Sequence, residues 1–127
     1  MTDYTIAPLE EPTWRIDPSQ FAEALVRQWP AAKIGTAPPA GSTIAVEALL
    51  PAADGAREVG VTLNGSGQAV GVESIDSRVT AELALWVRDL VGTQNEPLHL
   101  IEDAAMRLLP LVAETDIDTV VAWLRHS

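Results

Sequence analysis

The chain has 127 residues, and its apolar content of 47% is enough for the core of one domain of ordinary size. It contains no cysteine, which excludes disulfides, thiolate catalysis and zinc–thiolate sites. Eighteen acidic side chains against eight basic ones give a formal net charge of −10, and such a surface repels nucleic acid and anionic membranes. We therefore expect neither as a partner. The charge favours a basic protein instead, and the alternative is that it serves only solubility.

The sequence shows no apolar run of the roughly 18 residues that a membrane span needs. Its N-terminus lacks the basic and apolar regions of a signal peptide, which favours a cytoplasmic location. We expect a single domain over residues 1–127. Residues 1–13 have no clear pattern and are expected to be loosely ordered.

The first predicted element is a helix that ends at Pro30. Asp17 is a suitable N-cap for it. Phe21, Leu25 and Trp29 then recur every four residues and form one apolar stripe. This pattern is typical of a helix that packs against a core and carries no chemistry.

Three strand-like runs follow at residues 43–50, 57–63 and 68–75, after a Gly- and Pro-rich loop at 35–42. Turn residues separate the runs, at 51–56 and in the sequence Asn-Gly-Ser-Gly that begins at Asn64. The three runs therefore predict an antiparallel meander.

The second half of the chain predicts a helix over 77–91, strands at 98–101 and 107–112, and a helix over 116–125. Together with the meander, these elements predict an α+β fold. We expect an antiparallel sheet of about five strands, with two to three amphipathic helices packed mainly on one face.

The turn of the second hairpin suggests a register. If the chain turns through residues 64–67, facing residues have numbers that sum to 131. Gly60 then faces Gly71, and beside them Glu58 faces Glu73, a like-charge pair that ordinarily destabilises a sheet.

A six-residue loop in the first hairpin would place Leu49 opposite Glu58 and Glu47 opposite Gly60. The result is a glycine-floored acidic surface that a cation, an arginine-rich loop or another backbone could approach closely. Its predicted residues are Glu47, Glu58, Gly60, Gly71 and Glu73. The alternative is a solvated sheet face whose glycines relieve twist or lie under a helix.

The remaining acids, the histidines and the serines do not form a recognisable catalytic or metal-binding pattern. The acidic run at 114–118, together with Glu102 and Asp103, lacks the glycine and closing glutamate of a calcium loop, and its acids suit helix capping. His99 lies inside a short strand, and no serine has a nucleophile-elbow setting. We therefore expect no catalytic residue, no cofactor and no metal site.

Three segments resemble those of small acidic proteins of Streptomyces and related actinobacteria, largely without assigned function. They are Trp-Arg-Ile-Asp-Pro from Trp14, Gly-Gln-Ala-Val from Gly67 and Ala-Leu-Trp-Val-Arg-Asp-Leu-Val from Ala84. The resemblance covers most of the chain from Trp14 onward and implies a shared fold without indicating an activity. In those relatives an acidic-aromatic stretch follows the strand at 98–101, whereas residues 104–106 here replace its aromatic part, so a site on that stretch would not carry over.

These observations leave three functional hypotheses. The first is a non-enzymatic protein-binding module, such as an immunity protein, inhibitor or regulatory partner of a basic protein. The second is an assembly subunit that self-associates through an edge strand or an exposed tryptophan. The third is a small-ligand or metal-dependent enzyme that uses carboxylates and His99. The charge and the lack of recognisable catalytic residues favour the first.

Overall fold

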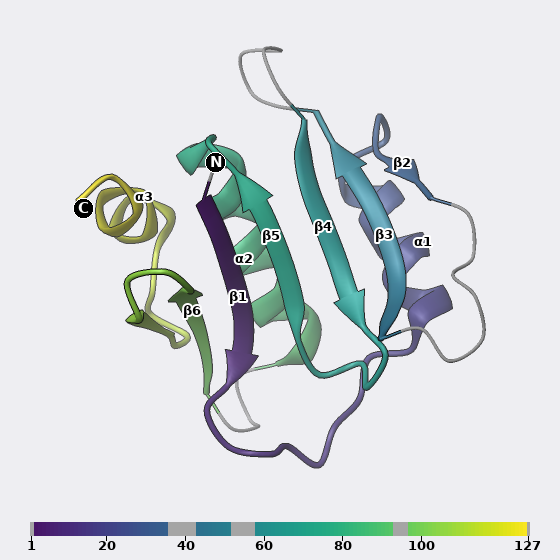
Figure 1. Cartoon of the computed structure of the whole chain (residues 1–127), viewed down its shortest axis with the longest axis horizontal. Helices are drawn as coiled ribbons and strands as arrows, with labels where there is room; N and C mark the ends of the chain where they lie inside the picture. The colour runs from purple at the N-terminus through teal and green to yellow at the C-terminus, as the bar shows by residue number, and fades with distance from the viewer. Residues whose placement is uncertain (1, 36–42, 52–57, 93–96, 127) are drawn as a thin grey trace.

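The computed structural model describes residues 2–35, 43–51, 58–92 and 97–126. Its seven strands form one antiparallel sheet in the order β2-β3-β4-β5-β1-β6-β7 (Figure 1). The α+β class and the antiparallel sheet are as predicted. In chain order the elements are β1 (Thr2–Pro8), α1 (Pro18–Gln28), β2 (Lys33–Ile34), β3 (Ile44–Leu50), β4 (Val59–Asn64), β5 (Val70–Ser74), α2 (Ser77–Val91), β6 (Leu98–Glu102), β7 (Arg107–Leu111) and α3 (Ile117–Arg125).

The predicted count of about five strands is wrong, because neither β1 nor β2 has a strong strand pattern. β1 belongs to the N-terminal segment that was expected to be loosely ordered, yet it lies inside the sheet between β5 and β6. Its Tyr4 and Ile6 side chains are only 8% and 1% exposed, so this strand is part of the core. β2 has two residues and pairs with the edge of β3.

Each helix begins at an aspartate that caps it. Asp17, Asp76 and Asp116 accept hydrogen bonds of 2.8–3.0 Å from backbone N–H groups of the first turns, which belong to Gln20, Val79 and Thr119. The predicted cap at Asp17 is confirmed, and Asp116 has the capping role expected for the acidic run. Within the described residues, no helix combines the length and apolarity needed to cross a membrane.

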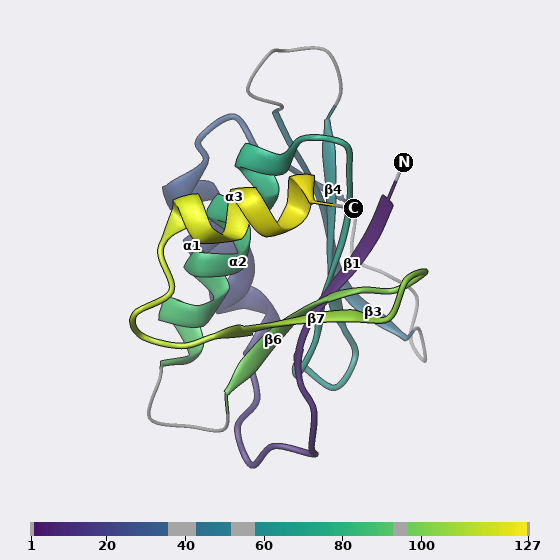
Figure 2. The ribbon, with the colours of Figure 1, turned by 90° about the vertical axis from the view of Figure 1, so that its left-hand side faces the viewer.

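All three helices lie on the same side of the sheet, as the view along its edge shows (Figure 2). The strands direct valine and leucine side chains toward them, and the core residues from the helices include Phe21, Leu25, Val79, Leu83, Val87, Val120 and Leu124. The Trp86 ring lies 5.6 Å from that of Phe21 and 5.5 Å from that of Trp29, which joins α2 to α1. The tryptophans are half-buried at the margin of this aliphatic core.

The β4–β5 hairpin turns later than predicted, so the numbers of its facing residues sum to 133 and not to 131. Gly60 faces Glu73, and Gly71 faces Thr62. The predicted pairing of Gly60 with Gly71 is therefore wrong, as is that of Glu58 with Glu73. The Asn64 side chain causes the difference, because its carboxamide oxygen accepts hydrogen bonds from the backbone N–H groups of residues 68 and 69 and closes a longer loop.

The β3–β4 hairpin is displaced in the same way. Leu49 faces Gly60, where Glu58 was predicted, and Glu47 faces Thr62, where Gly60 was predicted. A displacement of two residues keeps every side chain on its predicted face, because the side-chain period of a strand is two. The predicted connections at 35–42 and 51–56 lie almost entirely outside the described residues.

The β4–β5 loop is also held from outside the hairpin, by the segment before α1. The Ile16 N–H donates to the Gly67 carbonyl at 2.8 Å. The Gln68 carboxamide donates to the carbonyls of Pro12 and Trp14 at 3.3 and 3.1 Å. Gly67 has a φ of +73°, and a Cβ there would lie 2.6 Å from the Ile16 carbonyl oxygen, so this contact requires glycine.

The contact predicts a large loss of stability in Gly67→Ala. Gly92 provides the control, since its φ is +90° but a Cβ there would meet none of the described residues within 4 Å. We expect Gly92→Ala to lower the free energy of unfolding by about 1–2 kcal/mol through backbone strain alone. Gly67→Ala should lower it by about 2 kcal/mol more, because the segment that ends at Ile16 must also lose hydrogen bonds. Equal losses in urea denaturation would show that this segment does not hold the loop.

Candidate functional site

The candidate site lies on the face of the sheet opposite the helices, here called the outer face (Figure 2). Its side chains are those that alternate with the buried valines and leucines of each strand. In the four strands β3, β4, β5 and β1 they include Glu47, Leu49, Gly60, Thr62, Gly71, Glu73, Asp3 and Thr5. The predicted site residues on these strands therefore share one face, and Asp3 and Thr5 join them from the strand that was not predicted.

One row of side chains crosses this face at right angles to the strands. The strand registers place successive neighbours opposite one another, and the Asp103 N–H donates to the Asp3 carbonyl at 3.2 Å at the end of the row. From the β2 edge inward the row contains Lys33, Leu49, Gly60, Glu73, Asp3 and Asp103. It thus changes from a cation through an apolar residue and a glycine to three adjacent acids.

A hollow of about 410 Å³ lies over the β2 end of this row. Leu49, which is 43% exposed, supplies its apolar side chain, whereas Ile34 pairs with the buried Ala48 and directs its side chain to the helix side. Glu47 and Glu73 lie on the strands on either side of β4, where Glu47 faces Thr62 and Glu73 faces Gly60, and Gly60 contributes no side chain. The hollow therefore combines apolar surface, open backbone and two carboxylates.

A second hollow of about 320 Å³ lies over the acidic end, where Asp3, Thr5, Gly71 and Asp103 line it. The Thr5 hydroxyl donates to the Asp103 carboxylate at 2.9 Å, which fixes that side chain beside Asp3. Both hollows are lined by Gly60, Thr62 and Glu73. They therefore form one continuous depression across the strands, here called the sheet trough.

The charges of the trough are unbalanced. Lys33 reaches the β2 end, but its ammonium lies 3.3 Å from the Glu58 carboxylate. Glu58 is thus paired at the edge and does not line either hollow. Among the described residues, no cationic side chain forms an ion pair with Glu47, Glu73 or Asp3. Asp3 and Glu73 also face each other directly on neighbouring strands, an arrangement that lowers stability.

Glu102 and Asp103, adjacent in the sequence, lie on different faces. Asp103 belongs to the trough, whereas the Glu102 carboxylate is on the helix side, 3.6 Å from the Arg107 guanidinium. Arg107 in turn stacks on the Trp123 ring at 4.3 Å and donates to its carbonyl at 2.7 Å. Glu102 therefore belongs to the contact between β7 and α3.

His99 lies on the outer face but apart from the acids. Its strand register places it between Ala7 and Pro110, and its Nδ1 is buried and has no hydrogen-bond partner among the described residues. Asp103 is four residues further along, about 13 Å away at the rise of a β-strand. Within the described part of the chain, no group of three or more histidine and acidic side chains is placed to hold a metal ion. The hypothesis of an enzyme that uses carboxylates with His99 gains no geometric support.

Among the described residues, two side chains have shifted pKa values, and both serve the fold. Burial raises the pKa of the Tyr4 phenol, and the nearby Glu102 carboxylate adds to the rise. Hydrogen bonds from the Thr119 hydroxyl and N–H lower the pKa of the Asp116 carboxyl, as expected for a helix cap.

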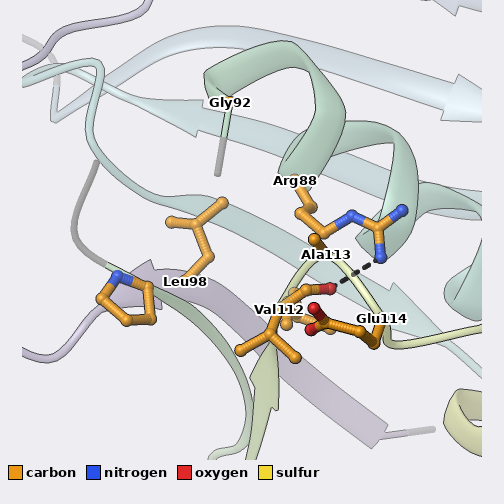
Figure 3. Close-up of a pocket in the computed structure, with 8 residues that line it drawn as sticks. Arg88, Gly92, Leu98, Val112, Ala113 and Glu114 are labelled. Carbon is orange, nitrogen blue, oxygen red and sulfur yellow. Dashed lines mark hydrogen bonds between the residues drawn. The ribbon is translucent and has the colours of Figure 1, made fainter. Parts of the chain in front are cut away.

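A separate hollow of about 260 Å³ lies where α2 ends and β6 begins, with Leu98, Val112 and Glu114 among its lining residues (Figure 3). Its Arg88 side chain is only 13% exposed. The guanidinium donates to the carbonyls of Val112 and Thr115 at 2.9 and 2.6 Å, so it ties α2 to the segment after β7. The helical pattern does not reveal this role, because Arg88 lies outside the apolar stripe of the helix.

We expect Arg88→Met to lower the free energy of unfolding by about 1.5–3 kcal/mol, because the carbonyls of Val112 and Thr115 lose a charged donor. The matched control is Arg78→Met on the same helix, where the arginine forms only an exposed ion pair with Glu82. That change should lower stability by less than about 1 kcal/mol. Thermal or urea denaturation measures both variants, and similar losses would contradict an anchoring role for Arg88.

Comparisons with known proteins add no family to this geometry. No protein-family model, no curated protein and no solved structure matches the chain.

Proposed function

We propose that this protein is a binding module that holds a basic polypeptide on the outer face of its sheet, as an inhibitor, immunity or regulatory protein would. The observation that carries the proposal is the sheet trough, an open depression with unbalanced carboxylates on a face that none of the described helices covers. Acidic surfaces attract basic partners over a distance and orient them on contact.

The arrangement of the acids supports binding rather than solubility alone. Acids that serve only solubility are best dispersed, because like charges on facing strand positions lower stability. Here Glu73 and Asp3 face each other and Asp103 lies next in the row. A cationic side chain placed among them would remove the repulsion, so binding would also stabilise the fold.

Glycine at the floor of the trough supports contact with a partner chain. Gly60 leaves its backbone open on this face, whereas Gly71 makes room for the Thr62 hydroxyl, which lies 2.6 Å from the position of a Cβ there. A partner side chain can therefore lie close to the sheet and still reach the carboxylates on either side.

The self-association hypothesis has one specific observation in its favour. At the β7 edge, Leu108 is 45% exposed and Met106 in the adjoining turn is 75% exposed. Sedimentation velocity at two protein concentrations separates the two functions, because a module for a basic partner stays monomeric while an assembly subunit shifts to larger species. Pro110 limits strand addition at this edge, because it cannot donate a backbone hydrogen bond.

The proposal predicts the behaviour of a triple variant, Asp3→Asn, Glu47→Gln and Glu73→Gln. With fluorescein-labelled nona-arginine as the probe, we expect the variant to bind about 10- to 100-fold more weakly than the parent at low salt, since each lost charge pair contributes about 0.5–1 kcal/mol. Binding to the parent should weaken steeply as sodium chloride is raised. Fluorescence anisotropy measures both effects.

The matched control removes the same number of charges at exposed positions that line neither hollow, with Glu10→Gln, Glu11→Gln and Glu23→Gln. When both variants are compared with the parent at physiological salt, this control should bind within about twofold of the parent, because charges further away than about 8 Å are screened there. The trough variant should also melt at a higher temperature than the parent, since it loses the repulsion between Asp3 and Glu73. Equal weakening in both variants would show that only net charge matters and would refute the site.

A further inference from the structure

We propose that the sheet trough selects a particular pattern in its partner: an extended segment with one apolar residue and two arginines at alternate positions, in the order apolar-x-Arg-x-Arg or its reverse. The inference rests on the proposed function and goes beyond it, because it assigns a sequence preference to the bound polypeptide.

The spacing follows from the row that crosses the sheet. Leu49, Gly60, Glu73 and Asp3 lie on four neighbouring strands, β3, β4, β5 and β1 (Figure 1). At a strand spacing of about 4.8 Å, Glu73 lies about 10 Å from Leu49, and Asp3 lies about 14 Å from it. The apolar and acidic parts of the trough are therefore separated by a fixed distance.

An extended peptide laid along the row presents every second side chain to the sheet, at intervals of about 7 Å. With its apolar residue on Leu49, the side chain two positions away starts above Gly60 and reaches Glu73. The side chain four positions away starts about 13 Å from the first, close to Asp3. Both positions thus call for a cation.

Arginine fits these positions better than lysine. Gly60 contributes no side chain to the floor of this hollow, so a planar guanidinium can lie on its backbone next to Glu73, with Glu47 diagonally across β4. Its fork of donors binds carboxylates in pairs, whereas an ammonium acts as a point charge.

The Lys33–Glu58 ion pair determines which end of the trough takes the apolar residue. Lys33 lines the hollow beside Ile34 and Leu49, and its ammonium is 3.3 Å from Glu58. A cationic side chain placed there would meet this ammonium, while an apolar one would cover Leu49. The arginines are therefore directed to the end that holds Glu73, Asp3 and Asp103.

Four labelled peptides test the inference by fluorescence anisotropy at low salt. Two carry the pattern in its two directions, Gly-Leu-Ser-Arg-Ser-Arg-Gly and Gly-Arg-Ser-Arg-Ser-Leu-Gly. The third has the same composition with leucine between the arginines, Gly-Arg-Ser-Leu-Ser-Arg-Gly, and the fourth replaces both arginines of the better pattern peptide by lysine. We expect one of the first two to bind about five- to tenfold more tightly than the third, and the lysine peptide to bind several-fold more weakly than its arginine parent.

Two variants locate the preference on the protein. Leu49→Ser should abolish the difference between the pattern peptide and its permuted isomer. Leu108→Ser should preserve it, since Leu108 has almost the same exposure, 45% against 43%, but lies on β7 away from the trough. Loss of the difference in both variants, or in neither, would contradict the assignment.

The outcome for nona-arginine separates this inference from the proposed function. If nona-arginine binds with salt dependence while the isomeric peptides bind alike or not at all, the pattern preference is overturned and the basic-partner function stands. If nona-arginine and all four peptides fail to bind, both are overturned. Arginine amide as a competitor gives a further check, because displacement at equal concentrations would show that a free cation suffices and that no extended segment is selected.

Discussion

The sheet buries one face and leaves the other open, and the chemistry of this protein depends on that asymmetry. Three helices cover the inner face, where the strands supply side chains such as Val61, Val72 and Leu100 that are at most 3% exposed. Because side chains alternate along a strand, the same residues that build the core also determine which neighbours are displayed outside. The displayed positions hold acids and glycines, and the registers align them into one trough.

Local patterns in the sequence were sufficient for most of the fold. The helices have strong apolar stripes and aspartate caps, and the strands of the meander are rich in valine, so their limits could be placed closely. β1 could not be found in this way, because only Tyr4 and Ile6 mark its buried face. The hairpin registers depend on the Asn64 side chain and on a contact with residues about fifty positions earlier, and neither effect is visible in a turn pattern.

Local sequence patterns were also sufficient to predict part of the candidate site. An error of two residues preserves the face of a strand, so Glu47, Gly60, Gly71 and Glu73 were correctly expected to lie on the same side of the sheet. Their pairings were wrong, and Glu58 forms an ion pair with Lys33 at the edge. Two acids of the trough come from unexpected places, since Asp3 belongs to the unpredicted strand and Asp103 follows β6. An alternating pattern around Tyr4 was the one signal that could have revealed Asp3.

The central claim is that the outer face of the sheet, and not the acidic surface as a whole, binds a basic polypeptide. Nuclear magnetic resonance of ¹⁵N-labelled protein during a titration with nona-arginine tests this claim most directly, because each backbone amide reports its own surroundings. We expect the largest chemical-shift changes at Gly60, Gly71, Glu73 and Asp3, with small changes in α1 and α3. Changes spread evenly over exposed acids such as Glu23 and Asp118, or concentrated on the helices, would contradict the account.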